Sequence, residues 1–128
     1  MNLQTHLEID TNLSGRVIEL AKDYAKVRLV TSKEMLADKQ GLIHGGFTFS
    51  AADFAAMAAV NEPNVVLTAS ECRFLAPVVL GDEVLFEARL QEAEGAKAKV
   101  FVEAFVSEKK VFEGVFKTYT PKEHILKK

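Results

Sequence analysis

The sequence has no tryptophan and a single cysteine, Cys72, among its 128 residues. One cysteine cannot form an internal disulfide and excludes a cysteine-rich metal site, which fits a reducing cytoplasm. No stretch reaches the roughly 18 apolar residues that a membrane span needs, and the N-terminus MNLQTHLEID has neither a basic flank nor an apolar run. The net charge of −2 does not favour nucleic acid or an anionic membrane as a partner. We therefore expect a cytoplasmic protein.

The length and composition fit one compact domain over residues 1–128. The chain is 48% hydrophobic and 27% charged, which is ordinary for a globular protein. It is long enough for one core and too short for two. Residues 1–13 are expected to form a short lead with a helical turn near its end, and residues 121–128 a polar tail.

Six apolar-rich runs predict strands. Residues 16–21 and 24–30 flank Lys22 and Asp23, a spacing that predicts a tight hairpin. Residues 31–43 are expected to be a loop or short helix. Four later runs alternate apolar with polar residues, at 65–77, 83–93, 98–108 and 111–120. Turn residues separate them, so we expect an antiparallel meander with one dry face.

A helix is predicted from Gly46 to the residues before Pro63. Alanine, the best helix former, occupies positions 51, 52, 55, 56, 58 and 59. A helix that is apolar nearly all round is normally buried on most sides. The whole pattern predicts an α+β fold in which an antiparallel sheet wraps one long central helix. Exposed sheet edges are most simply covered by a second copy, so we expect a homodimer.

The stretch GLIHGGFTFSAADFAAMAAVNE raises the question of why one aspartate, Asp53, interrupts so apolar a segment. Gly45 and Gly46 follow His44 at the expected helix start, where free N–H groups and the helix dipole can stabilise an oxyanion. Asp53 lies eight residues beyond Gly45, up to ~12 Å along the helix. If the two cooperate on one carbonyl, Gly45 of one protomer must face Asp53 of another. Burial in an apolar helix would raise the pKa of Asp53.

The same stretch resembles the G-x-x-HGG-x6-x-D-x-A signature of hotdog-fold acyl-CoA thioesterases, the phenylacetyl-CoA and 4-hydroxybenzoyl-CoA thioesterase group. The segment RFLAPVVLGD is similar to that superfamily's R-F-x-x-P-V-x-x-G-D strand, and the resemblance spans residues 14 to 120. It implies hydrolysis of an acyl-CoA thioester, with Asp53 as general base or nucleophile, Gly45 as oxyanion amide and His44 as a positioning residue. It also implies a homodimer or homotetramer.

A thioester needs neither a metal nor a cofactor for this chemistry, and none is expected. The expected substrate-binding residues are Gly46, Asp38, Phe54, Met57, Thr68 and Ser70. Asp38 departs from the family pattern, because many members have Asn or Gln at that position, and a second carboxylate could repel Asp53 or an anionic substrate. Arg73, Lys97, Lys99, Lys109 and Lys110 are the cations available for coenzyme A phosphates.

Other interpretations stay open. The strands also resemble the acyl-CoA-sensing hotdog domain of the repressor of fatty-acid synthesis, which implies a non-catalytic binding module, although only 13 residues precede the first strand where that regulator has a DNA-binding region. A hotdog dehydratase would need its histidine and acid arranged differently. Asp53 could be a solvated edge residue, His44 a structural residue at the helix start, and the glycines a relief of crowding.

Overall fold

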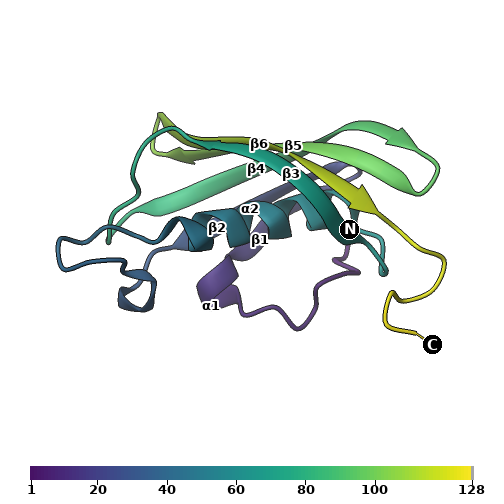
Figure 1. The fold of residues 1–128 in the computed structure, drawn as a ribbon, viewed down its shortest axis with the longest axis horizontal. Coiled ribbons are helices and arrows are strands. Elements are labelled where there is room, and N and C mark those ends of the chain that lie inside the picture. The colour runs from purple at the N-terminus through teal and green to yellow at the C-terminus, as the bar shows by residue number, and fades with distance from the viewer. Residues whose placement is uncertain (128) are drawn as a thin grey trace.

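The computed structural model describes residues 1–127. A six-stranded sheet curves over one central helix (Figure 1). In chain order the elements are α1 (Thr11–Ser14), β1 (Arg16–Ala21), β2 (Tyr24–Val30), the 3-10 turn η1 (Lys33–Met35), α2 (Gly45–Val60), β3 (Val66–Phe74), β4 (Glu83–Glu94), β5 (Lys97–Val106) and β6 (Lys109–Tyr119). No helix within residues 1–127 is both long and apolar enough to cross a membrane.

The sheet is antiparallel throughout, in the order β1-β2-β4-β5-β6-β3. The predicted hairpin is confirmed, with Ala21 opposite Tyr24 around a two-residue turn. The expected four-stranded meander is wrong for one strand, because β3 pairs with β6 and not with β4. Alternation identifies which face of a strand is dry but does not identify its neighbour. β3 therefore becomes an outer edge of the sheet.

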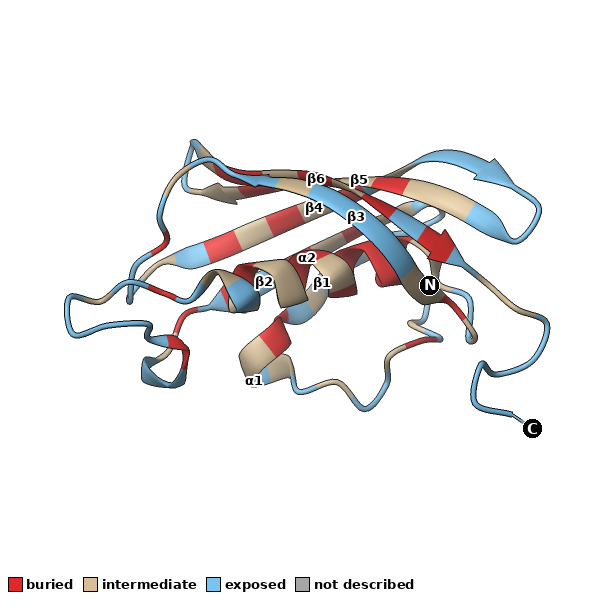
Figure 2. Ribbon diagram, in the orientation of Figure 1, coloured by how far each residue is buried: buried red, intermediate tan, exposed pale blue. Residues whose placement is uncertain are grey.

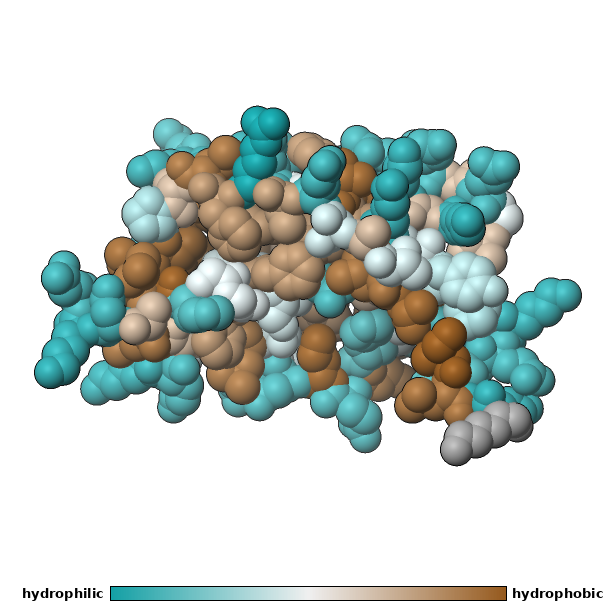
Figure 3. All heavy atoms as spheres, in the orientation of Figure 1, coloured by the Kyte–Doolittle hydropathy of each residue, from teal (hydrophilic) through white to brown (hydrophobic). Residues whose placement is uncertain are grey.

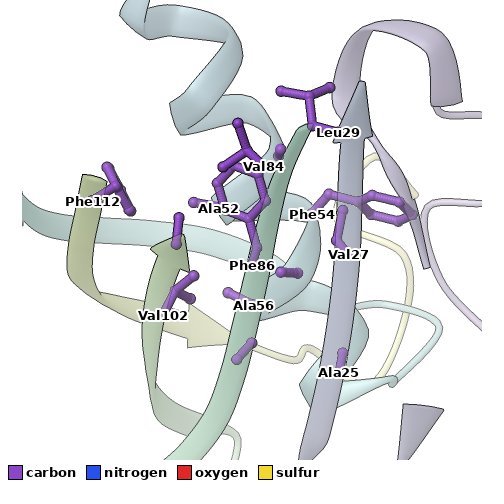
Figure 4. Packing of buried hydrophobic residues seen from close by; sticks show 14 of the residues in the cluster. Ala25, Val27, Leu29, Ala52, Phe54, Ala56, Val84, Phe86, Val102 and Phe112 are labelled. Carbon is purple, nitrogen blue, oxygen red and sulfur yellow. The ribbon is translucent and has the colours of Figure 1, made fainter. Parts of the chain in front are cut away.

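Helix α2 lies in the concave face of the sheet because its side chains are small. Ala51, Ala52, Ala55 and Ala56 are completely buried, which lets the strands approach the helix backbone. Figure 4 shows Ala52 and Ala56 against the inward side chains of β4, and Figure 2 shows burial running along both the helix and the covering strands. The core thus fixes the helix on the sheet, and with it every side chain that the helix presents.

The N-terminal lead is tied to the end of α2 by one residue, Asn61. Asn61 ends the helix in a left-handed conformation with φ 53°, and its N–H donates to the Met57 carbonyl. Its side chain accepts from Gln4 N–H at 2.7 Å and donates to the Asn2 carbonyl at 2.9 Å. The lead is therefore held across the helix face that the sheet leaves uncovered.

Replacing Asn61 separates the two tasks of this residue. In Asn61→Gly the left-handed helix end is retained, because glycine adopts positive φ without strain, while both side-chain bonds to the lead are lost. We expect about 1 kcal/mol lower stability and faster amide hydrogen exchange over residues 1–6, with exchange in α2 unchanged. Asn61→Asp, which keeps the acceptor for Gln4, should give an intermediate result. Unchanged exchange in the lead of the glycine variant would refute this role.

Candidate active site

His44 caps the start of α2. It has extended backbone angles, and its Nδ1 accepts from the N–H of Gly46 at 2.8 Å. The His44 N–H donates to the Met35 carbonyl at 2.9 Å, which ties the helix start to η1. One of the free N–H groups of the first turn is thus satisfied by the imidazole. Among the described residues, the Gly45 N–H has no such acceptor and remains available to a ligand.

Both glycines of the first turn have close neighbours, and the contact at Gly46 is the tighter one. A Cβ on Gly46 would lie 2.7 Å from His44 Nδ1, so any other residue there displaces the capping imidazole. A Cβ on Gly45 would lie 3.3 Å from the ring of Phe74, which is exposed at the end of β3. Phe74 was not among the expected site residues, although it belongs to the quoted RFLAPVVLGD segment. It forms one wall beside the free Gly45 N–H.

Asp38 shapes the loop that leads to the helix. Its Oδ1 accepts from the N–H groups of Gln40 at 2.9 Å and Leu42 at 3.2 Å. Leu42 and Ile43 then form short bridges to Val79 and Leu36. The Asp38 carboxylate is exposed and accepts these two backbone hydrogen bonds. The acid that stands here in place of the family's Asn or Gln therefore stabilises the loop.

Asp53 projects from α2 on the side between the sheet edge and the N-terminal segment. At about 100° per residue it lies between Phe49 and Ser50 on the helix surface. The ring of Phe49 packs on Phe116 of β6, with centroids 5.6 Å apart. The hydroxyl of Ser50 is 2.7 Å from that of Ser14 in α1. Asp53 therefore faces the side on which β3 is the outermost strand.

The Asp53 carboxyl group is poorly solvated. Its Oδ1 is buried and has no hydrogen-bond partner among the described residues. Burial raises its pKa from the usual 3.8 to about 6. A carboxyl group with this pKa is ionised at neutral pH and is still basic enough to accept a proton. The expected rise of its pKa is confirmed.

The raised pKa has a measurable effect on stability. Folding favours the protonated form of Asp53, so its ionisation destabilises the fold progressively between the unfolded pKa of 3.8 and the folded pKa of about 6, and by a constant amount above that. Since the side chain is partly exposed, we expect a penalty of about 1 to 2 kcal/mol. Chemical denaturation of Asp53→Asn should show a gain over wild type that grows from pH 4 to pH 6 and then levels. A gain independent of pH would contradict this.

A shallow apolar groove of about 370 Å³ adjoins Gly45. It is lined by Leu42, Ile43, Gly45, Thr48, Phe74, Leu75, Ala76, Pro77, Val78 and Val111. Several large apolar side chains around it are exposed, namely Leu36, Leu42, Phe74, Leu75, Val79 and Leu80. Figure 3 shows hydrophobic side chains gathered toward the end of the molecule where the loop before α2 lies. Asp53 does not line this groove, so one protomer does not bring the carboxylate and the groove together.

The other expected binding residues are dispersed. Phe54 and Met57 are buried in the core, and Phe54 stacks on His6 of the lead with centroids 6.4 Å apart. Thr68 donates to the Lys117 carbonyl at 3.1 Å, and Ser70 lies opposite Phe116 on the edge strand β3. Thr118 on β6 was not expected, and its buried hydroxyl also lacks a partner in residues 1–127. Nothing in its sequence context marks it. The described residues contain no cluster of three metal-ligating side chains.

Residues 40–113 match the family model of the thioesterase superfamily. The chain therefore belongs to this superfamily, and its sheet and helix are the hotdog fold. A solved structure from Pyrococcus horikoshii is 43% identical with a TM-score of 0.98, covering 99% of this chain and 98% of that one. A sigma28-regulated virulence protein from Campylobacter jejuni is 42% identical with a TM-score of 0.94, covering 97% and 96%.

More distant similarity extends to the phenylacetic acid degradation protein PaaI from Thermus thermophilus. A mutant structure of that protein is 25% identical with a TM-score of 0.78, covering 85% of this chain and 95% of its own. The expected resemblance to PaaI-like hotdog thioesterases is thus confirmed.

Two curated relatives are longer than this chain. Methylthioribose-1-phosphate isomerase from Aquifex aeolicus is 53% identical over 92% of this chain but only 26% of its own length. Transcription factor FapR from Bacillus cereus is 30% identical over 82% of this chain and 55% of its own length. The similarity is therefore to one part of each of these proteins.

Proposed function

We propose that the protein hydrolyses acyl-CoA thioesters to the free acid and coenzyme A, and that two protomers build each site. The Gly45 N–H of one protomer binds the thioester carbonyl, and Asp53 of the other acts as general base or nucleophile. The observation that carries this proposal is the buried, unpartnered Oδ1 of Asp53 with its pKa raised to about 6. A buried carboxylate oxygen without a hydrogen-bond partner lowers the stability of the fold, and such groups are retained where they take part in a reaction.

The edge strand supports a dimer. β3 is nine residues long and ends the sheet, so one row of its backbone N–H and C=O groups is free to pair. Antiparallel pairing of β3 with β3 of a second copy would continue the sheet and lay the two helices side by side in opposite directions. The Gly45 end of one helix would then lie beside Asp53 of the other. Gly45 and Asp53, up to ~12 Å apart along the helix of one chain, would in this way meet across two chains.

The reaction needs no group beyond these. The Gly45 N–H stabilises the negative charge that develops on the carbonyl oxygen. If Asp53 is the base, it takes a proton from water as the water oxygen bonds to the carbonyl carbon, and the C–S bond breaks to release the thiolate. If Asp53 is the nucleophile, its oxygen forms a mixed anhydride, the thiolate leaves, and water then hydrolyses the anhydride. Both routes require ionised Asp53.

The similarity to FapR favours a second candidate, a module that binds an acyl-CoA without hydrolysing it. In such a module Asp53 would be a structural or ligand-contacting residue. The buried and unpartnered Asp53 carboxylate supports catalysis, because a group with a pKa of about 6 is ionised at neutral pH and can still accept a proton from water.

Free-thiol release from a panel of short, medium, long and aromatic acyl-CoAs tests the proposal and identifies the acyl class. Turnover above the spontaneous rate with at least one class is expected. Binding of acyl-CoA without thiol release from any class would overturn the hydrolase and favour the binding module.

A further inference from the structure

The C-terminal tail, residues 121–127, presents two adjacent apolar side chains to solvent. Ile125 is 56% exposed and Leu126 is 77% exposed. The turn that carries them is folded around His124, whose Nδ1 accepts from the Leu126 N–H at 3.0 Å and whose carbonyl accepts from the Lys127 N–H at 2.9 Å. A folded turn that holds an apolar pair outward is typical of a segment that packs on another surface.

The start of the tail is fixed beside the first residue of β3. The Asn64 side-chain amide donates to the carbonyls of Pro121 at 3.3 Å and Lys122 at 3.2 Å. Tyr119, the last residue of β6, pairs with Val66, the first residue of β3. Figure 1 shows the tail bending away from the end of β6 toward the side of the sheet on which α2 lies. The tail therefore lies at the start of the edge strand, on the helix side of the sheet.

The other end of β3 carries the second exposed apolar surface, the groove beside Gly45 described above, which we call the Gly45 groove. Leu42, Phe74 and Leu75 line it, and all three are exposed. Its rim is fixed, because Leu42 forms a bridge to Val79. Figure 3 shows hydrophobic side chains at two ends of one face, one toward the loop before α2 and the other toward the C-terminal tail. The two surfaces therefore lie at opposite ends of the same edge strand.

Antiparallel pairing of two β3 strands brings the tail and the groove together. Two antiparallel copies of one strand are related by a twofold axis perpendicular to the sheet, so both protomers keep their helices on the same side. The start of one β3 then lies beside the end of the other. The tail of one protomer and the Gly45 groove of its partner therefore meet on the helix side of the joined sheet.

We infer that each protomer packs Ile125 and Leu126 of its tail on the rim of its partner's Gly45 groove, at Leu42 and Leu75. This inference rests on the β3-paired dimer of the proposed function. The contact is made twice in each dimer, because the twofold axis repeats it. It closes the open side of a shallow groove with apolar side chains. The partner then supplies a wall beside Gly45 as well as the carboxylate.

Cysteine cross-linking tests this contact without any turnover. In a Cys72→Ser background, Leu126→Cys is combined with Leu42→Cys or with Leu75→Cys, and each protein is treated with a short bis-maleimide. We expect covalent dimers from at least one of the two pairs. The control combines Leu126→Cys with Ile18→Cys, because Ile18 is an exposed residue of β1, at the opposite edge of the sheet. The control should remain monomeric on a denaturing gel.

Sedimentation equilibrium measures what the contact contributes to the dimer. In the variant Ile125→Ser, Leu126→Ser the dimer Kd should rise about tenfold for each tail, and so about a hundredfold for both, because apolar burial is lost twice. The control Ile18→Ser, Val30→Ser removes two exposed apolar side chains from β1 and β2. It should retain the wild-type Kd.

The outcomes separate this inference from the proposed function. A wild-type dimer that gives no covalent dimer from either cysteine pair, or an unchanged Kd in the serine variant, overturns the tail contact and leaves the shared site standing. Covalent dimers that the Ile18 control forms equally also overturn it. Covalent dimers from the tail pairs alone support the contact even if no acyl-CoA releases thiol. A wild type that stays monomeric at every concentration overturns the contact together with the dimer.

Discussion

Replacing Asp53 with asparagine should lower kcat/KM for acyl-CoA hydrolysis by about 10³-fold, because an amide neither accepts the proton of water nor attacks a thioester. The change is nearly isosteric and removes a partly buried charge. The variant should therefore be at least as stable as wild type at pH 7, since burial of this carboxyl group is what raises its pKa. Loss of activity together with equal or greater stability separates catalysis from folding.

The pH dependence of kcat/KM in the wild-type protein is a second test of the role of Asp53. Activity requires the ionised form, so kcat/KM should rise tenfold per pH unit up to about 6 and then level. Asp23→Asn is the matched control, because Asp23 is an exposed carboxylate in the β1–β2 turn whose positive φ asparagine also accepts. It should retain the wild-type rate and profile. A profile without a limb near pH 6, or an asparagine variant with near-normal turnover, would exclude Asp53 as base and nucleophile.

Removing the Gly45 N–H should lower kcat by about 10²- to 10³-fold, the usual loss for one oxyanion donor. Gly45→Pro does this with little disturbance, because proline is well accepted at the first helical position and His44 already has the extended angles that precede proline. The added Cβ would lie 3.3 Å from the ring of Phe74, which is exposed and can shift.

Gly45→Ala is the control for this experiment. It adds the same Cβ beside Phe74 but keeps the N–H. The alanine variant should therefore retain most of the activity that the proline variant loses, as measured by thiol release at saturating acyl-CoA. Equal losses in both variants would mean that crowding at Phe74, and not the N–H, is what matters.

Local pattern was enough to predict most of the fold. The two-residue turn at Lys22 and Asp23, the alanine-rich helix before Pro63 and the alternating strands each depend on neighbours in sequence, and all are present. The position of β3 beside β6 was not predictable in this way, because strand pairing depends on contacts far apart in the chain.

The candidate site likewise combines features that are visible in the sequence with features that depend on the fold. Asp53 and the glycines could be singled out as candidates, because an isolated acid and an HGG motif are visible in the sequence itself. The cap formed by His44, the contact of Phe74 with Gly45 and the backbone bonds of Asp38 could not, because each depends on the path of the loop over residues 31–44. The position of the C-terminal tail beside the start of β3 likewise needed the pairing of β3 with β6.

The most direct test of a site shared between protomers is to mix two inactive variants. Gly45→Pro and Asp53→Asn each break every site of their own dimers. In a mixed dimer one site combines Asp53 from the first chain with Gly45 from the second and is intact, while the other site lacks both. After subunit exchange at equal concentrations, monitored by mass spectrometry, thiol release should recover to about a quarter of the wild-type rate, since half of the dimers are mixed and each has one intact site. Complete exchange with no recovery would contradict the shared site.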